Sequence, residues 1–485
     1  MTVLVRPSVR PVPLATDAAT DVAVPALLAT VGAGESVPLV GGRYARYVHL
    51  DNAASAPALT RVGDHVAEVL PYYASVHRGG GYLSQLCTGL YEQARRTVAG
   101  FVGARPDDVV VFTRNTTDAL NLLSTAVPGE VVVLDLEHHA NLLPWRSTRA
   151  YGARVVSSAV TLAATEAAVA AELVRRPAAL LAVTGASNVT GEVPDLRRLV
   201  RLAHAHGARV VVDAAQLLPH RGFDLAELDA DYVAFSGHKA YAPFGAGALV
   251  GRRDWLDVAE PHLAGGGAVR EVTTSATTWA SSPERHEGGT PNVLGALALA
   301  EALRTLDDTG LDRVRRHEAA LHRRLVNGLE QRGIEPLRIW PDAHDVVGVV
   351  SFTVPGYRSA QVAAYLSAEH GIGVRDGRFC AHPLLARLGA TDGAVRASLG
   401  VGTGSADVDR LLEALDALLA DGPRWTYVSD DAGCRPSPDD RRLPVWARLA
   451  GLDALSTAGT PCTPVPSTTS TSTTSTSTIP AGADR

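Results

Sequence analysis

One lysine and several other polar residues each follow a short apolar run of the sequence. Lys239 comes just after the run "DYVAFS" (231–236) and precedes a loop rich in Gly, Ala and Pro. Asp213 ends the run "ARVVVD" (208–213), and Gln216 comes three residues later. The other polar residues at such run ends are Thr116, Thr117, His138, Asn188, Ser236 and His238. Because ligands bind outside the carboxyl ends of the strands in an open α/β sheet, we expect these side chains to meet at one edge.

These side chains are the functional groups that hold and use pyridoxal phosphate. Hydroxyls at a helix N-terminus, such as Thr116 and Thr117, favour a phosphate. The imidazole of His138 can stack on a planar ring, and the carboxylate of Asp213 can keep a pyridinium nitrogen protonated. The amine of Lys239 can form a Schiff base with an aldehyde, and the small residues around it leave room for the ring. Each residue alone could be a helix cap or a packed core group, and it is their coincidence that favours the cofactor.

The elements that must position these residues form an alternating α/β pattern. Continuous Val- and Leu-rich runs are typical of strands covered on both faces, and here they occur at 108–113, 131–136, 179–184, 208–213, 231–236 and 247–251. Helix-like segments separate several of them, for example 195–207. The pattern predicts a doubly wound, mainly parallel sheet. The run at 247–251 follows too closely for a helical crossover, so it should pair antiparallel with the run before it.

A smaller α+β domain is predicted after the large one. Segments 348–356, 372–377 and 394–402 have strand character, and segments 359–371 and 405–422 have helix character. The N-terminal 1–45 is expected to be a weakly ordered arm. The Ser/Thr-rich 426–485 is expected to be a disordered tail, in which 441–455 could form a short amphipathic helix.

Eight motifs resemble the class V aminotransferase superfamily, most of all the cysteine desulfurases of the sulfur-mobilisation type and the selenocysteine lyases. They are "LDNAAS" (50–55), "TRNTTDALN" (113–121), "EHHAN" (137–141), "ASNVTGEVPD" (186–195), "VDAAQ" (212–216), "FSGHK" (235–239), "EGGTPN" (287–292) and "RASLG" (396–400). The resemblance implies the type I fold of pyridoxal-phosphate enzymes. Its large cofactor-binding domain would span 46–305, and its small domain 306–425, packed with part of the N-terminal segment.

The resemblance also implies roles for individual residues. Lys239 would bond the cofactor and shuttle protons, His138 would stack on its ring, and Asp213 and Gln216 would bind the ring nitrogen and hydroxyl. Asn188 would contact the ring or the substrate carboxylate. The implied phosphate ligands are Thr116, Thr117, Ser236, His238 and, across a dimer interface, Thr290. The implied substrate contacts are Arg396, which would clamp the carboxylate, Arg375, which would assist it, and His77 near the entrance.

Cys380, in "VRDGRFCAHPLL" (374–385), distinguishes between reactions on this cofactor. It resembles the cysteine that attacks the sulfur of L-cysteine as a thiolate, which gives a Cys380 persulfide and L-alanine. The family's histidines just before this cysteine are replaced by Arg378 and Phe379, while His382 follows it. If Cys380 only packs, the alternatives are a C–S β-lyase, a selenocysteine lyase or an aminotransferase. A further hypothesis is a binding protein that has the fold of the enzyme family without its activity.

Composition sets the remaining expectations. The 485 residues have a net charge of −6 and no long basic block, so nucleic acid is not an expected partner. We expect a cytoplasmic homodimer, with no transmembrane run, no signal peptide and no metal site. The expected partners are an amino-acid substrate and a sulfur-acceptor protein. Of the other cysteines, Cys87 should lie in the core or an interface, and Cys434 and Cys462 fall in the expected tail without a role.

Overall fold

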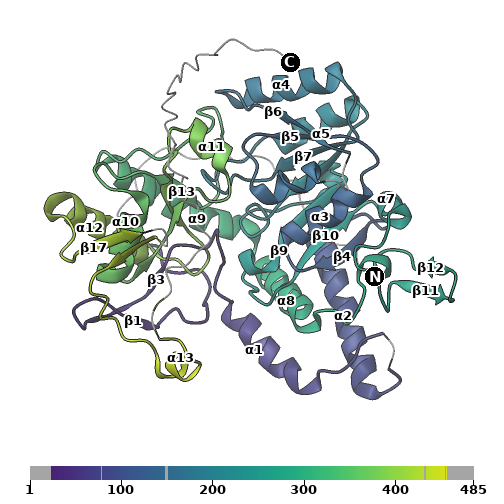
Figure 1. Ribbon diagram of the computed structural model, residues 1–485, viewed down its shortest axis with the longest axis horizontal. Coiled ribbons are helices and arrows are strands. Elements are labelled where there is room, and N and C mark those ends of the chain that lie inside the picture. Colours follow the sequence, from purple (N-terminus) through teal and green to yellow (C-terminus); the bar gives the residue numbers. More distant parts are fainter. Residues whose placement is uncertain (1–22, 78, 148–150, 431–432, 454, 456–485) are drawn as a thin grey trace, which may run out of the picture.

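The computed structural model describes residues 23–77, 79–147, 151–430, 433–453 and 455. Two domains lie side by side, with the large one on the right of Figure 1 and the small one on the left. Among the described residues, no helix is long and apolar enough to cross a bilayer.

The large domain is built on a seven-stranded sheet in the order β4-β10-β9-β8-β7-β5-β6. Its strands are β4 (Val109–Thr113), β5 (Val131–Leu134), β6 (Ala153–Val156), β7 (Leu180–Thr184), β8 (Arg209–Asp213), β9 (Tyr232–Ser236) and β10 (Gly247–Gly251). β5 to β9 are parallel, whereas β10 runs antiparallel to both β9 and β4. This confirms the mainly parallel doubly wound sheet and the antiparallel last pair. The sequence did not predict β6, whose mixed composition fits its place at the sheet edge.

Both faces of this sheet are covered, which is why its strands have no polar alternation. Val210 and Val212 of β8 pack into one apolar core, while Val211 between them packs into another on the opposite face. The helices of this domain are α1 (Thr60–Val69), α2 (Tyr82–Phe101), α3 (Thr116–Ala126), α4 (Leu162–Arg175), α5 (Leu196–Ala205), α6 (Leu225–Leu228), α7 (Arg253–Val258) and α8 (Val293–Thr309). A small hairpin, β11 (Val269–Val272) with β12 (Thr277–Trp279), projects from it (Figure 1).

The small domain has a three-stranded antiparallel sheet of β13 (Val349–Phe352), β16 (Ala394–Ser398) and β15 (Arg375–Gly377). Its helices are α9 (Leu311–Glu330), α10 (Ser359–His370), α11 (His382–Arg387) and α12 (Ser405–Asp421). β3 (Val48–His49) pairs in parallel with β14 (Ile372–Gly373), and Val48 and Leu50 pack in the core of the small domain. The N-terminal segment thus crosses to the small domain and brings the residues after β3 to the domain boundary.

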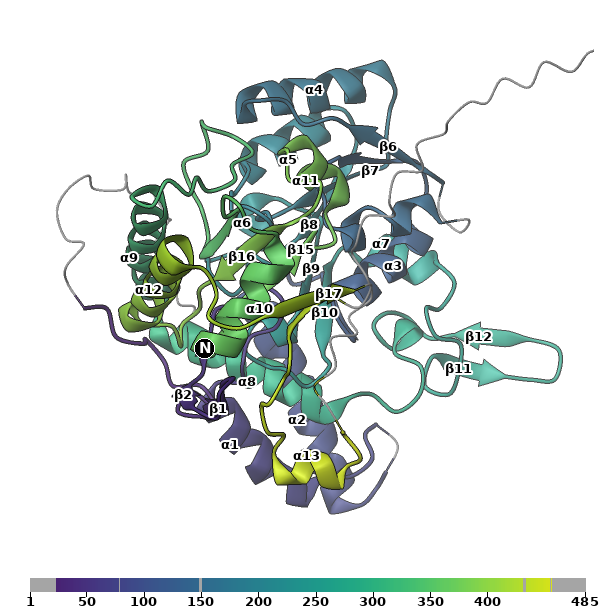
Figure 2. The same ribbon diagram turned by 60° about the vertical axis from the view of Figure 1, so that its left-hand side comes forward.

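Both ends of the chain carry more structure than the sequence indicated. β1 (Ser36–Pro38) and β2 (Tyr44–Arg46) form a hairpin within the expected arm. In the expected tail, β17 (Tyr427–Asp430) pairs antiparallel with β18 (Gly433–Pro436), followed by α13 (Val445–Leu449). Packing of β17 and β18 against α10, which the sequence does not show, places these two strands (Figure 2). The helix α13 lies within 441–455, where the sequence allowed a short helix. The Ser/Thr-rich run and Cys462 lie outside the described residues.

Candidate active site

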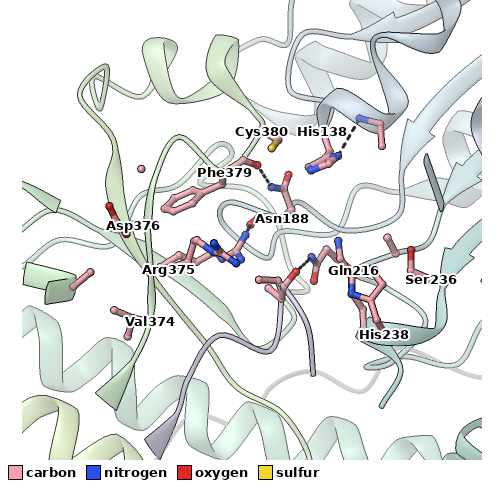
Figure 3. Close-up of a pocket in the computed structure, with 18 of the residues that line it drawn as sticks. His138, Asn188, Gln216, Ser236, His238, Val374, Arg375, Asp376, Phe379 and Cys380 are labelled. Atoms are coloured by element: carbon pink, nitrogen blue, oxygen red, sulfur yellow. Dashed lines mark hydrogen bonds between the residues drawn. The ribbon is translucent and has the colours of Figure 1, made fainter. Parts of the chain in front are cut away.

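A cavity of about 740 Å³ lies between the two domains and collects most of the residues singled out from the sequence (Figure 3). The large domain contributes Thr116, Thr117, His138, Asn188, Asp213, Gln216, Ser236, His238 and Lys239. The small domain contributes Arg375, Phe379, Cys380 and Arg396. The predicted meeting of strand ends at one edge therefore occurs, and the second domain closes the space above it.

Lys239 ends a single 3-10 turn (Gly237–Lys239) that directly follows β9. Glycine is required at this corner, because a Cβ on Gly237 would lie 2.7 Å from the carbonyl oxygen of Ala246. Desolvation lowers the pKa of Lys239 to about 8, despite the attraction of Asp213. About a tenth of the amine is therefore unprotonated at pH 7, far more than for a free lysine, and a nucleophile or a base requires this neutral form. Lys239 is also the only lysine in the whole sequence, a signal that the strand-end analysis did not use.

Asp213 ends β8 and Gln216 follows it, and the two side chains offer two hydrogen-bond acceptors to a ring. The backbone N–H of Ala215 donates to Oδ1 of Asp213 at 3.0 Å, and burial raises the pKa of this carboxyl. Nε2 of Gln216 donates to the carbonyl of Ala53 at 2.7 Å. Oε1 of Gln216 is buried and has no hydrogen-bond partner among the described residues, so it is available to a hydroxyl donor of a ligand.

The N-terminus of α3 forms the anion-binding end of the cavity. Asn115 caps the helix by accepting from the N–H of Asp118 at 3.0 Å. The hydroxyl of Ser236 accepts from the N–H of Thr116 at 2.9 Å and lies 2.7 Å from its hydroxyl, which ties β9 to this helix end. Thr117 and His238 line the cavity beside them. The helix dipole, N–H groups and hydroxyls together fit a phosphate.

His138 is held as a neutral ring over this part of the cavity. Desolvation, and to a smaller extent the charge of Lys239, lowers the pKa of His138 to about 3. Its Nδ1 accepts from the N–H of Ala140 at 3.0 Å, which fixes the orientation of the imidazole. The turn behind it is anchored by the fully buried Glu137, which accepts from Nδ2 of Asn141 at 2.7 Å and from the N–H of Thr184 at 2.9 Å.

Arg396 lies on β16 and is almost fully buried at the wall facing Asn188. Its Nη1 donates to the carbonyl of Asn188 at 2.9 Å, and its Nη2 lies 3.3 Å from Asp51. The guanidinium stands 5.0 Å from the centre of the Phe379 ring. Burial lowers the pKa of Arg396 to about 10. Its Nε has no hydrogen-bond partner among the described residues, so it can still donate to a carboxylate.

Asp51 joins Arg396 and Arg375 into one cluster. Its two oxygens lie 3.3 Å from Nη2 of Arg396 and 3.2 Å from Nη2 of Arg375. Asp51 comes directly after Leu50, so the segment that crosses between the domains delivers this carboxylate. The sequence analysis did not single it out, although it belongs to the quoted "LDNAAS" motif.

Cys380 sits in a loop that both domains hold. Phe379 and Cys380 have φ values of 48° and 53°, which side chains other than glycine rarely adopt. Nδ2 of Asn188 donates to the carbonyl of Phe379, and the N–H of His139 donates to the carbonyl of Cys380, both at 2.8 Å. These bonds from the large domain hold Cys380, which is exposed, at the cavity (Figure 3).

Two histidines flank this loop, although neither lies directly before Cys380 in the sequence. The rings of His139 and His382 lie 4.6 Å apart in an edge-to-face arrangement. Desolvation lowers the pKa of both, so both are neutral near pH 7 and can accept a proton. The sequence analysis missed His139, because its place beside Cys380 comes from contact between the domains.

Two of the predicted site residues lie outside the cavity lining, and one residue without a predicted role lies in it. His77 is not among the lining residues; it binds Glu92 at 2.9 Å through Nε2 in the loop before α2. Thr290 also lies outside this lining, and its role across a dimer interface stays a prediction. Cys434, which the sequence left without a role in the tail, lines the cavity on β18. Cys87 is buried in a core with Tyr91, as expected.

The residues present fit pyridoxal phosphate. The unpartnered Oε1 of Gln216, the anion-binding end of α3, the carboxylate of Asp213 and the amine of Lys239 correspond to its hydroxyl, phosphate, ring nitrogen and aldehyde. The neutral imidazole of His138 supplies a flat surface for the ring.

Comparisons with known proteins agree with this geometry. The family model for aminotransferase class-V matches residues 48–411. The cysteine desulfurase of Dickeya dadantii is 37% identical over 379 residues, which cover 76% of this chain and 90% of the relative. The apo structure of the Thermococcus onnurineus cysteine desulfurase matches with a TM-score of 0.71 at 35% identity, covering 77% of this chain and 94% of its own. The Escherichia coli cysteine desulfurase CsdA matches with a TM-score of 0.69 at 34% identity, over 77% of this chain and 94% of its own.

Fold and cavity together define a pyridoxal-phosphate-dependent enzyme with the type I fold. The chain belongs to the aminotransferase class-V family, and within it the chain is cysteine desulfurase-like.

Proposed function

We propose that this enzyme removes sulfur from L-cysteine, giving L-alanine and a persulfide on Cys380. The observation that carries the proposal is that Cys380 lines the same cavity as Lys239 and Arg396. A base, a carboxylate clamp and a thiol are thus available to one small amino acid.

The polar groups of the cavity position this substrate. Arg396, with its free Nε, takes the substrate carboxylate, and Asn188 is placed beside it by the bond between the Asn188 carbonyl and Nη1 of Arg396. Arg375, half-exposed at the same wall, adds positive charge near the carboxylate. With its carboxylate bound by Arg396, the substrate would direct its side chain toward the Cys380 loop.

Pyridoxal phosphate, when bound, supplies an aldehyde for the substrate amino group and a ring that withdraws electrons from Cα. Lys239, whose pKa is about 8, is the base that takes the α-proton. Asp213 would hold the ring nitrogen of the cofactor, and the neutral imidazole of His138 would lie against its ring.

Sulfur transfer then uses the thiolate of Cys380. It attacks Sγ of the substrate, the Cβ–Sγ bond breaks, and the electron pair returns to the substrate carbon, which takes up a proton. L-Cysteine and the Cys380 thiol become L-alanine and the Cys380 persulfide, without any external oxidant or reductant. His139 and His382 are the neutral bases that flank the loop and can take the thiol proton.

The test is product analysis with L-cysteine and a thiol reductant. We expect equal amounts of alanine and sulfide from the wild type, and loss of alanine formation on the order of 100-fold or more in Cys380→Ser. Cys87→Ser is the matched control, because Cys87 is buried away from the cavity. Pyruvate with ammonia would identify a C–S β-lyase instead, and full activity of Cys380→Ser would remove the persulfide mechanism.

We also propose a homodimer in which Thr290 reaches the phosphate of the neighbouring subunit. Thr290 lies in the loop just before α8 and outside the cavity of its own chain, which is what such a role requires. Light scattering on the holoenzyme would report the mass of the dimer. The sulfur-acceptor protein and the cytoplasmic location remain predictions from the sequence.

A further inference from the structure

The segment after α12 is attached to the small domain by a buried carboxylate. Glu369, on α10, accepts from the N–H groups of Arg424 and Trp425, both at 3.2 Å, and from the hydroxyl of Tyr427 at 3.0 Å. Glu369 is 5% exposed, so these bonds are shielded from water. The match to the family model ends at residue 411, and the segment after α12 is therefore held along α10 by specific bonds.

The C-terminal hairpin, β17 (427–430) paired with β18 (433–436), continues this route toward the cavity. Nη2 of Arg358, at the start of α10, donates to the hydroxyl of Ser429 at 2.8 Å. Ser429 lies opposite Cys434 in the β17–β18 ladder. In Figure 2, β17 extends along α10 on the side of the large domain. The hairpin is thus held against α10 at both strands.

This placement makes Cys434 part of the cavity wall. Gly433 and Cys434 line the cavity together with Ser359, Ala360, Ala363 and Ala364 of α10. The side chains that this helix face contributes to the cavity are small, and Cys380 lines the same cavity. Cys380 and Cys434 both carry a thiol and neither is in a disulfide within the part of the chain that the structure describes, so one cavity holds two sulfur nucleophiles from segments 54 residues apart.

We propose that Cys434 is the first acceptor of the sulfur carried by Cys380, so that the C-terminal hairpin is an internal sulfur relay. This inference rests on the proposed cysteine desulfurase function. The Cys434 thiolate attacks the outer sulfur of the Cys380 persulfide, the S–S bond breaks, and Cys380 leaves as a thiolate. The product is a Cys434 persulfide, and the sulfur keeps its oxidation state. A thiolate attacking a sulfur–sulfur bond is the ordinary chemistry of thiol exchange, and it regenerates Cys380 for the next turnover.

The relay has a geometric advantage over direct transfer. The first transfer takes place inside the cavity and needs no external protein to reach the Cys380 loop. Because both thiols belong to one chain, the transfer is intramolecular and benefits from a high effective concentration. A later acceptor then meets the sulfur on the hairpin, which is outside the family-matched residues 48–411.

The test follows the sulfur by mass spectrometry of the holoenzyme. One equivalent of L-cysteine is added without reductant, the thiols are alkylated at set times, and the protein is digested with trypsin. The sequence places the four cysteines on separate tryptic peptides, 79–95, 379–387, 425–441 and 449–485. We expect the extra sulfur first on peptide 379–387 and then on peptide 425–441. The final amounts of sulfur on the two peptides should agree within about tenfold, because the two persulfides are chemically alike.

Variants separate the relay from other routes. Cys434→Ser should keep alanine formation in the first turnover and hold the sulfur on Cys380. Cys87→Ser is the control and should behave as the wild type. In a mixture of Cys380→Ser and Cys434→Ser enzymes, the intact Cys434 of the first protein should gain sulfur at least tenfold more slowly than in the wild type. Equal rates would show transfer through solution and overturn the relay.

Three further outcomes also decide between the hypotheses. A loaded Cys380 with an unmodified Cys434 would overturn the relay and leave the desulfurase function intact, as would a Cys380–Cys434 disulfide with released sulfide. Absence of sulfur from Cys380 itself would overturn the proposed function, and the relay with it.

Discussion

The two walls of the cavity are built in different ways. The large-domain wall takes Thr116, Asp213, Ser236 and Lys239 from the ends of strands in one sheet or from the helix that follows a strand. The small-domain wall takes Arg375, Cys380, Arg396 and Cys434 from segments far apart in the chain, and Asp51 pairs with both arginines of this wall.

The difference is one of backbone support. Side chains at strand ends are placed by the ladder hydrogen bonds of the sheet, so their position follows from topology. The opposite wall is placed by single bonds across the domain boundary, such as those from Asn188 and His139 to the Cys380 loop. Changes in the large-domain wall should therefore abolish chemistry without altering the fold. Changes in the other wall should alter stability, order or sulfur transfer.

The largest effect is expected for Lys239→Ala in the large-domain wall. Alanine formation should fall on the order of 10³-fold or more, because both the attachment point of the cofactor and the base are removed. Circular dichroism should show an unchanged fold. Borohydride reduction of the wild-type holoenzyme should leave a pyridoxyl group on Lys239, and since no other lysine exists, the variant should carry none on any lysine.

The next effect concerns the pH dependence of the same amine. In the apoenzyme, the pKa of Lys239 is about 8 instead of the 10.5 of a free lysine, mainly because of desolvation. Acetylation of Lys239 should therefore rise about tenfold per pH unit below pH 8 and level off above it. Folding stability should rise with pH between about 8 and 10.5, because the unfolded chain binds this proton more tightly in that range. Quantitative peptide mapping measures the rate, and a midpoint near 10.5 would contradict a desolvated amine.

A stability effect is expected for Asp51→Asn in the small-domain wall. Removing the carboxylate leaves the buried Arg396 without its anionic partner, which should lower the free energy of unfolding by about 1–3 kcal/mol. Arg375→Gln is the matched control. It removes the half-exposed partner of the same carboxylate, so it should cost less than about 1 kcal/mol. Urea denaturation of the two variants compares them, and equal losses would show that burial of Arg396 does not govern this cluster.

The smallest effect is expected for Glu369→Ala behind the C-terminal hairpin. Three donors lose their shared acceptor, so amide hydrogen exchange should increase about tenfold over 424–430 and 433–436. Exchange in β8 and β9 should not change. Arg358→Ala removes only one exposed bond to Ser429 and should have a smaller effect. Equal exchange in both variants would mean that the hairpin is held by other contacts.

The sequence predicted those site residues whose positions depend only on neighbouring parts of the chain. Continuous apolar runs predicted the strands, and the polar residues after them predicted the large-domain wall, since a strand end fixes where the next side chain goes. The antiparallel β10 was predicted because its connection to β9 is too short for a crossover. Asp51, His139 and the C-terminal hairpin were not predicted, because their positions depend on contacts between segments far apart in the chain.

The sequence by itself determined the parallel sheet and the set of groups that suit pyridoxal phosphate, because strand periodicity and residue chemistry are local properties. Only the tertiary structure decided that Asp51 joins Arg396 to Arg375, that two histidines flank Cys380, and that Cys434 reaches the cavity. Burial of Val48 and Leu50 stabilises the segment that carries Asp51, and the bonds of the buried Glu369 stabilise the segment that leads to Cys434. The Cys380 loop is held by the bonds from Asn188 and His139 of the other domain, which no local pattern of the sequence shows.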